Sequence, residues 1–200
     1  MTPTDFQQAV LGWFDQHGRS NLPWQQDINA YRVWVSEIML QQTQVSTVIP
    51  YYERFMESYP DVKSLATASL DEVLHHWTGL GYYARARNLY KTANWLVTHT
   101  SGEFPTSIEG LCELPGIGRS TAGAISSIAF KIPATILDGN VKRVLARFSA
   151  TAGWPGNNAV LQKLWLVADS YTPDTRVADY TQAMMDMGAT LCTRSAPSCY

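Results

Sequence analysis

The sequence lacks the apolar segments that place a chain in a membrane or send it across one. No run of about 18 apolar residues occurs, so we predict no membrane-spanning helix. The start, Met1–Asp5, has neither the basic residues nor the apolar run of a secretory signal peptide. We therefore expect a cytoplasmic protein. If it binds DNA, it would be associated with a bacterial nucleoid.

Charge and cysteine are also scarce. Charged residues make up 16% of the 200 residues, and the net charge at pH 7 is −2. A nucleic-acid surface would therefore have to be a local basic patch rather than a property of the whole chain. The three cysteines are Cys112, Cys192 and Cys199. In a reducing compartment they are expected as free thiols or metal ligands rather than disulfides.

Regular alternation of apolar and polar residues, the pattern of a half-buried strand, is missing as well. Apolar residues instead recur at helical spacing between Gly, Pro, Asn and Asp boundaries. The predicted helices are 6–17, 30–42, 44–58, 69–77, 83–98, 107–113, 120–131, 140–150, 157–171 and 177–188. The sequence thus predicts an all-α protein, with length for one large domain or two small lobes.

The segment Leu114–Gly118 joins two of these helical patterns. Its two glycines, Gly116 and Gly118, permit positive φ and a close approach of the backbone. The helix after them begins with backbone N–H groups that suit a phosphate oxygen. A plain helix–turn–helix corner is the simpler interpretation of such a short motif.

Glu37 is unusual within the predicted helix 30–42. At about 100° per residue, Val33 and Leu40 lie on one side of it and Trp34 on the other. The polar arc of the helix is expected at Arg32 and Ser36 instead. Apolar surroundings disfavour an ionised carboxylate, so we expect this residue to hold a proton near neutral pH. An ordinary surface glutamate is the alternative.

Asp138 begins the predicted helix 140–150, where a helix N-cap is the default role. A helix N-terminus favours the ionised carboxylate. A proton-holding Glu37 and an anionic Asp138 would suit cleavage of a glycosidic bond through an oxocarbenium-like transition state. The spacing of the two residues does not by itself bring them together.

Two polar segments could contact nucleic acid. Gln41, Gln42 and Gln44 offer amides that can contact base edges. In Thr78–Arg87, a tyrosine beside a glycine turn can enter a base stack while arginines meet phosphates. A polar helix end and a turn before a core helix are the plainer explanations.

Taken together, these segments resemble the endonuclease III superfamily of DNA glycosylases, and within it the adenine DNA glycosylases of the MutY type. The motifs that carry the resemblance are Leu22–Gln25, Val35–Val45, Gly79–Ala86, Leu114–Gly123, Leu137–Val144 and Gln182–Gly188. The resemblance implies base excision repair of adenine paired with 8-oxoguanine or guanine in duplex DNA, by a monomer. It implies that Glu37 protonates adenine at N7 and assists the water, and that Asp138, with Asn140 beside it, stabilises the sugar cation.

The resemblance also assigns roles in binding. Residues that would flip the adenine or line its pocket are Trp24, Gln25, Gln41, Gln42, Tyr82, Ser120 and Gln182. Residues that would contact phosphates are Gly116, Gly118, Arg119, Arg85, Arg87 and Arg143. Bifunctional lyases of the superfamily carry a lysine where this chain has Ser120, so a monofunctional glycosylase is expected. A bifunctional lyase and a non-catalytic helix-hairpin-helix module remain alternatives.

The implied fold has two helical lobes with DNA in the cleft between them. One lobe is a six-helix barrel at 23–134, and the other combines 1–22 with 135–200. In the family the second lobe ends in a 4Fe–4S cluster. Cys192 and Cys199 fit the first two of its four cysteine ligands, so we expect the cluster in a longer parent and an incomplete one here. The C-terminal domain that helps read 8-oxoguanine is also missing. We therefore interpret the chain as truncated, with reduced discrimination of the lesion.

Overall fold

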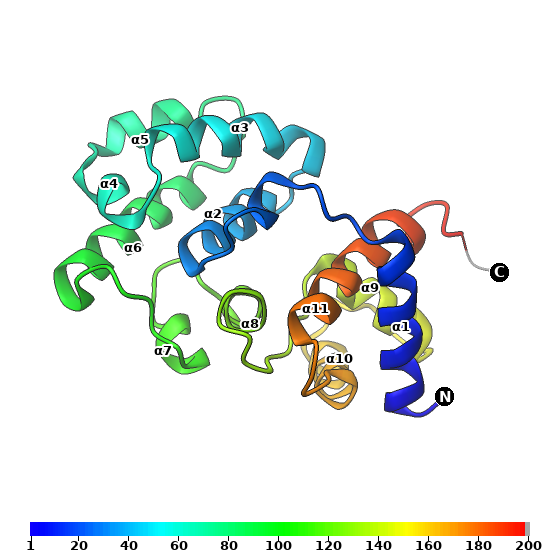
Figure 1. Ribbon diagram of the computed structural model, residues 1–200. Coiled ribbons are helices and arrows are strands. Elements are labelled where there is room, and N and C mark those ends of the chain that lie inside the picture. The colour runs from blue at the N-terminus through cyan, green and yellow to red at the C-terminus, as the bar shows by residue number, and fades with distance from the viewer. Residues whose placement is uncertain (199–200) are drawn as a thin grey trace. The chain divides into compact units, whose positions relative to one another are not determined.

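The computed structural model describes residues 1–198, which form helices joined by turns (Figure 1). They contain no strand, which confirms the predicted all-α class. The chain divides into two compact units, Asn21–Phe130 and a terminal unit made of Met1–Ser20 with Lys131–Tyr200. Within the described residues no helix is both long and apolar enough to cross a membrane.

The Asn21–Phe130 unit packs its helices around a core of large aromatic and aliphatic side chains. Its elements are η1 (Pro23–Gln25), α2 (Ala30–Leu40), α3 (Val45–Ser58), α4 (Val62–Thr67), α5 (Leu70–His76), α6 (Ala84–Thr100), α7 (Ile108–Cys112), α8 (Arg119–Ala124) and η2 (Ile125–Ala129). The core includes Trp34, Trp77, Tyr52 and Phe55, each almost completely inaccessible to solvent. Burying one such side chain contributes roughly 1.5–3 kcal/mol.

Helix α2 is the central element of this unit. Asn29 caps its start by accepting a hydrogen bond from the Arg32 backbone N–H at 2.9 Å. Seven of its 11 residues are buried, as expected for a helix that is apolar on nearly every side. Ser36, which the sequence placed in a polar arc, is buried and donates its hydroxyl to the Val33 carbonyl at 2.9 Å.

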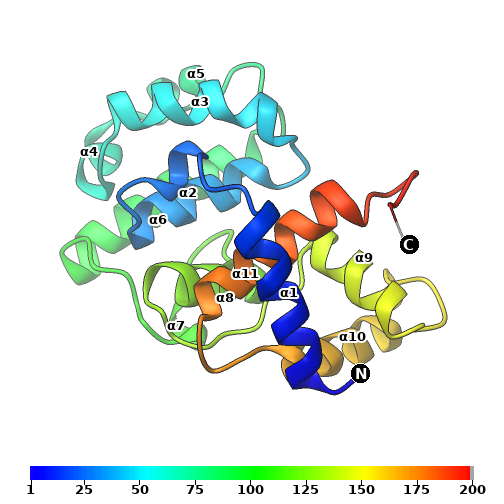
Figure 2. The same cartoon turned by 45° about the vertical axis from the view of Figure 1, so that its right-hand side comes forward.

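The terminal unit combines the first 20 residues with the segment that starts at Lys131. Its elements are α1 (Pro3–His17), α9 (Gly139–Phe148), α10 (Asn158–Tyr171), α11 (Val177–Asp186) and η3 (Met187–Leu191). Helices α1 and α11 lie side by side in both views (Figures 1 and 2). Phe6 of α1 packs against Phe148 and Tyr171, with ring centroids 4.3 and 5.0 Å away.

The structure differs from the predicted helices in two respects. Helix α4 was not predicted, although Asp61 and Ser64 form a reciprocal capping box at its start. Its six residues are too few to show a helical period. The predicted helices 120–131 and 177–188 are each split, because their last turns widen into the π-helical segments η2 and η3. Apolar periodicity cannot distinguish such a turn from an α turn.

Candidate functional site

The hairpin between α7 and α8 is anchored by Leu114 and Ile117, which are buried. Gly116 has φ +80°, and a Cβ there would lie 2.8 Å from the Cβ of Asn88. This position requires glycine. Gly118 has φ −92°, so only Gly116 of the two glycines uses the positive φ that glycine permits.

Gly118 is also the N-cap of α8 and supplies no capping side chain. Arg119 and Ser120 form the first turn of that helix, where Arg119 is exposed and Ser120 is half-buried. The start of α8 therefore presents backbone amides and one cation at the hairpin, as a phosphate contact requires.

Glu37 lies in the last turn of α2 and is half-buried. Its neighbours Val33, Trp34 and Ile38 are buried, as the sequence predicted for the first two. The carboxyl group thus sits on the most apolar helix of the unit. That setting is compatible with the acid role expected from the sequence.

Asp138 is the N-cap of α9, and its Oδ1 accepts a hydrogen bond from the Val141 backbone N–H at 2.8 Å. Burial nevertheless raises the pKa of this carboxyl. The backbone N–H groups of Val141 and Asn140 and the cations Arg143 and Lys142 oppose the shift only in part. The helix N-terminus favours the ionised form, as the sequence predicts, but desolvation outweighs it.

Asn140 is held from two sides. Its Oδ1 accepts a hydrogen bond from Arg143 at 2.8 Å. A Cβ at Gly188 would lie 2.5 Å from the Cβ of Asn140, so only glycine lets η3 pack this closely against α9. Arg143 also donates to the carbonyls of Gly188 and of Cys192, the latter at 2.6 Å.

Arg143 makes four hydrogen bonds within the terminal unit. A fourth donation, at 3.2 Å, goes to the carbonyl of Gly139. Arg143 also lines an open groove, so a contact between Arg143 and phosphate stays a prediction. Its N–H groups bind the protein's own oxygen atoms and tie α9 to the segment after α11.

Arg85 departs from its predicted role on phosphate. It is only 8% exposed, and five backbone carbonyls accept its hydrogen bonds. They belong to Ile38, Met39, Gln41, Leu80 and Gly81. A guanidinium enclosed in this way cannot reach DNA, so the phosphate role is wrong for Arg85. Arg87, two residues later on α6, is exposed.

Gln41, Gln42 and Tyr82 are all exposed at loops of the Asn21–Phe130 unit. Gln42 has φ +57° and Tyr82 has φ +51°. A non-glycine residue in this region is strained, and such strain concentrates at functional sites. Trp24 and Gln25 lie elsewhere in the same unit, on η1. Trp24 is buried edge-on to a core tyrosine, and the Gln25 side chain accepts from the Leu22 backbone N–H at 3.0 Å.

Gln182 belongs to a polar network that the sequence analysis missed. Its Nε2 donates to Asp186 at 2.9 Å. Asp186 is fully buried and also accepts from the Arg19 guanidinium, at 2.6 Å for the shortest bond. A carboxylate can only accept, so it fixes which end of the Gln182 amide faces it. The sequence signal for this network is Asp186, an aspartate among methionines in the segment Met184–Met187.

Cys192 is half-buried and its Sγ lies 3.2 Å from a guanidinium nitrogen of Arg147. Cys199 lies outside the described residues. Nowhere in residues 1–198 do three His, Cys, Asp or Glu side chains gather as a metal site would require. The residues that the structure describes therefore do not fit a cluster with four thiolate ligands.

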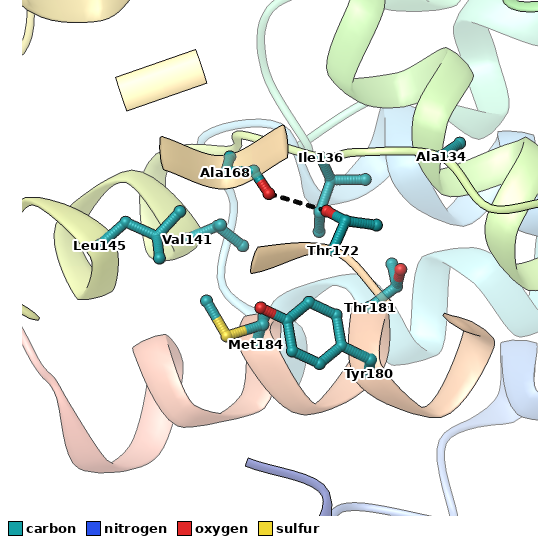
Figure 3. Close-up of a pocket in the computed structure, with 9 residues that line it drawn as sticks. All are labelled: Ala134, Ile136, Val141, Leu145, Ala168, Thr172, Tyr180, Thr181 and Met184. Carbon is teal, nitrogen blue, oxygen red and sulfur yellow. Dashed lines mark hydrogen bonds between the residues drawn. The ribbon is translucent and has the colours of Figure 1, made fainter. Parts of the chain in front are cut away.

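A small cavity and an open groove lie in the described part of the terminal unit. The cavity, shown in Figure 3, has a volume of about 10 Å³ and is lined by side chains such as Ile136, Tyr180 and Met184. That is room for one water molecule at most. The groove has a volume of about 500 Å³. Its lining includes the exposed Trp154 and the cations Lys142, Arg143, Arg147 and Arg194.

Comparison with known proteins identifies the family. Residues 35–170 match the family described as HhH-GPD superfamily base excision DNA repair protein. The chain belongs to this superfamily. The HhH-GPD match covers the α7–α8 hairpin, Glu37 and Asp138, and it confirms the superfamily expected from the sequence motifs.

Curated relatives of this HhH-GPD chain include adenine DNA glycosylases. The one from Buchnera aphidicola subsp. Baizongia pistaciae is 48% identical over 200 residues, which are 100% of this chain and 56% of the relative. The human one is 46% identical over 205 residues, covering 98% of this chain and 37% of the relative. The chain thus spans about half or less of the length of these relatives.

Solved structures confirm the HhH-GPD fold. A thermostable thymine-DNA glycosylase matches with a TM-score of 0.88 at 24% identity, over 98% of this chain and 90% of that one. A trapped covalent intermediate of endonuclease III with DNA matches with a TM-score of 0.80 at 23% identity, over 100% and 92%. At such identities the likeness concerns the fold alone.

Proposed function

We propose that this chain is the catalytic part of an adenine DNA glycosylase. It would hydrolyse the N-glycosidic bond of adenine paired with 8-oxoguanine or guanine in duplex DNA. The observation that carries the proposal is the 48% identity to an adenine DNA glycosylase along the entire chain. The motifs expected to perform the chemistry all lie within that match.

The proposed mechanism uses two carboxyl groups. Glu37, on its apolar helix, would donate a proton to adenine N7 and then assist the attacking water. Asp138 would stabilise the positive charge that develops on the sugar. Its raised pKa supports this role, because a desolvated carboxylate is poorly stabilised until a cation forms beside it. The hydrogen bond from Arg143 would hold Asn140 ready at the same helix end.

Recognition of the adenine would use several of the side chains described above. Gln41, Gln42 and Tyr82 are exposed and would enter the base stack as the nucleotide is flipped out. Gln182 turns its NH₂ group to Asp186 and so would offer its carbonyl oxygen as an acceptor for the amino group of adenine. Trp24, Gln25 and Ser120 would complete the pocket.

Phosphate binding would fall to the α7–α8 hairpin and to two exposed arginines. Gly116 and Gly118 would let the DNA backbone approach the first turn of α8, where Arg119 lies. Arg87 of α6 would supply a second cation. The open groove beside α9, lined by Lys142 and Arg147, is a further local basic patch of the kind that the low overall charge requires.

The test is release of free adenine under single-turnover conditions. Three duplexes that differ in the base opposite adenine (8-oxoguanine, guanine or thymine) would be compared. We expect release from the first two and little from the third, since the thymine pair costs most to open. Binding without release from any duplex would instead support a non-catalytic DNA-binding module.

Iron would be measured in the same preparation. A 4Fe–4S cluster needs four ligands, and these 200 residues contain three cysteines, Cys112, Cys192 and Cys199. We expect the chain to purify without stoichiometric iron and without the brown colour of the cluster. A full complement of four iron atoms in the monomer would contradict this.

A further inference from the structure

Arg85 is a buried cation whose hydrogen bonds go to the backbone. One nitrogen donates to the carbonyls of Ile38, Met39 and Gln41, at 3.0, 2.8 and 2.7 Å. The second donates to Leu80 and Gly81, at 3.3 and 3.1 Å. The two terminal nitrogens of one guanidinium therefore bind two segments that are about forty residues apart in sequence.

The first segment is the C-terminal end of α2. The last carbonyls of a helix have no partner within it and carry partial negative charge, which a cation offsets. Arg85 thus caps the helix that carries Glu37 and holds the backbone of Gln41. Gln42, the next residue, has φ +57° and is exposed.

The second segment is the turn Gly79–Tyr83. Two side chains hold the backbone of this turn and of the residue before it. Trp77 donates its indole N–H to the Gly81 carbonyl at 2.9 Å, and Tyr51 donates its hydroxyl to the Thr78 carbonyl at 3.0 Å. Tyr82 has φ +51°, is 60% exposed, and has its ring centroid 5.4 Å from the Arg85 guanidinium carbon. The ring therefore rests against the buried cation.

These contacts explain how two strained, exposed residues keep one conformation. A left-handed non-glycine backbone persists only where its surroundings determine it. At both Gln42 and Tyr82 the carbonyl of the preceding residue is a partner of Arg85. Lysine could not replace the arginine, because its single nitrogen cannot address both segments in this planar arrangement.

We propose that Arg85 is a positioning residue, which joins the end of α2 to the Gly79–Tyr83 turn and so presents Gln42 and Tyr82 for opening the base stack. The inference rests on the proposed function, since it assumes that these residues enter DNA. In this proposal Arg85 does not contact phosphate but holds two segments of the protein together, and we call its hydrogen bonds to these segments the clamp. Arg85 would then act on the step that extrudes adenine and not on the cleavage of the bond.

The test compares adenine release from two DNAs, one fully paired and one in which the adenine is an unpaired bulge. Extrusion costs less from the bulge. Arg85→Met removes the clamp, and Arg85→Lys keeps the charge without the two-sided geometry. Two controls lie on the same helix: Arg87→Met removes an exposed charge, and Leu89→Ala destabilises the core, where Leu89 is 1% exposed. Every rate is divided by the folded fraction from circular dichroism.

We expect Arg85→Met to slow release from paired DNA by roughly tenfold or more, and release from the bulge by only about threefold or less. Arg85→Lys should show a smaller loss with the same bias. Both controls should affect the two DNAs equally. Equal losses for Arg85→Met on the two substrates would overturn the proposal and leave Arg85 a stabilising residue only.

A second measurement is independent of catalysis. Backbone hydrogen exchange in the free protein should become faster at 41–44 and at 79–83 together in Arg85→Met, but not in Leu89→Ala. Unchanged exchange at either segment would contradict the clamp. If the parent chain releases no adenine while exchange behaves as expected, the proposed function fails and the clamp stands as a structural device.

Discussion

Each unit contains a helix capped by an aspartate, and the two caps make the same backbone hydrogen bond but differ in their electrostatics. Asp61 caps α4 in the Asn21–Phe130 unit and Asp138 caps α9 in the terminal unit. Each accepts a backbone hydrogen bond from three residues ahead at 2.8 Å. The pKa of Asp61 is lowered, first by the backbone hydrogen bond from Ser64, whereas burial raises the pKa of Asp138.

The difference shows that a cap hydrogen bond does not determine the charge of the carboxylate. At the surface the backbone N–H dipoles dominate, so an aspartate cap stabilises both its helix and its own ionised form. In a buried site the loss of hydration exceeds the same dipoles. A carboxyl kept in that costly state is a candidate for chemistry, and one at the surface is a structural cap.

Substitution of Glu37 should give the largest loss of activity, because the comparison of the two caps makes a carboxyl group among apolar neighbours a candidate for chemistry. Glu37→Gln removes the proton that adenine needs as it leaves, and general acid catalysis contributes roughly 10²–10⁴-fold. We expect single-turnover adenine release to fall by about that factor while duplex binding persists. Glu53→Gln, an exposed glutamate on α3, is the matched control and should be unaffected. Near-parental turnover in Glu37→Gln would remove Glu37 from the mechanism.

Replacing the two caps by asparagine tests the comparison directly. Asparagine keeps the capping oxygen, so both helices should persist. Asp138→Asn loses the anion facing the sugar cation and should slow release by about 10²–10³-fold, as for other preorganised charges. Asp61→Asn should retain the parental rate per folded molecule. If Asp138→Asn is equally active once corrected for folding, Asp138 is a cap only.

Ser120→Lys should give a smaller change, a gain of strand cleavage. A lyase needs an amine that forms a Schiff base with the sugar, and neither a hydroxyl nor the permanently protonated Arg119 can do so. We expect little covalent complex to be trapped by borohydride in the parent, and more in the variant, with some nicking. Efficient strand cleavage by the parent without heat or alkali would favour the bifunctional alternative.

The smallest expected effect is on thermal stability. Replacing the two capping aspartates by asparagine should shift Tm at pH 7 in opposite directions. The folded pKa of Asp138 is raised, so ionisation lowers the free energy of unfolding as pH rises above the ordinary value of 3.8. Asp138→Asn should therefore raise Tm at pH 7, because the uncharged amide avoids the cost of burying an anion.

Asp61 has a lowered pKa, so its stabilisation is present above pH 3.8 and is lost as pH falls through the folded value. Asp61→Asn should lower Tm slightly at pH 7. Both differences should disappear in acid, and thermal melts at several pH values would measure them. Tm changes of the same sign for the two variants at pH 7 would contradict the comparison.

The sequence predicted the all-α class and most helices, because apolar spacing and capping residues are local signals. It also identified the superfamily, since glycines such as Gly116 are required by backbone geometry. It could not give the burial of Asp138, which depends on residues remote in sequence. The same limit explains the error at Arg85. An arginine beside aromatic residues has the same sequence pattern whether its guanidinium contacts DNA or five carbonyl oxygens of the protein.

Burial of Arg85 has a consequence for the response to salt. DNA binding is strengthened by the release of ions condensed on phosphates, and each cation that neutralises a phosphate contributes about 0.9 to the slope of log affinity against log salt. Arg85 directs both of its terminal nitrogens to backbone carbonyls and is only 8% exposed, so it releases no such ion. Of the chain's 15 lysines and arginines, Arg85 should therefore add nothing to the salt slope. Whatever it contributes to DNA affinity should persist at high ionic strength.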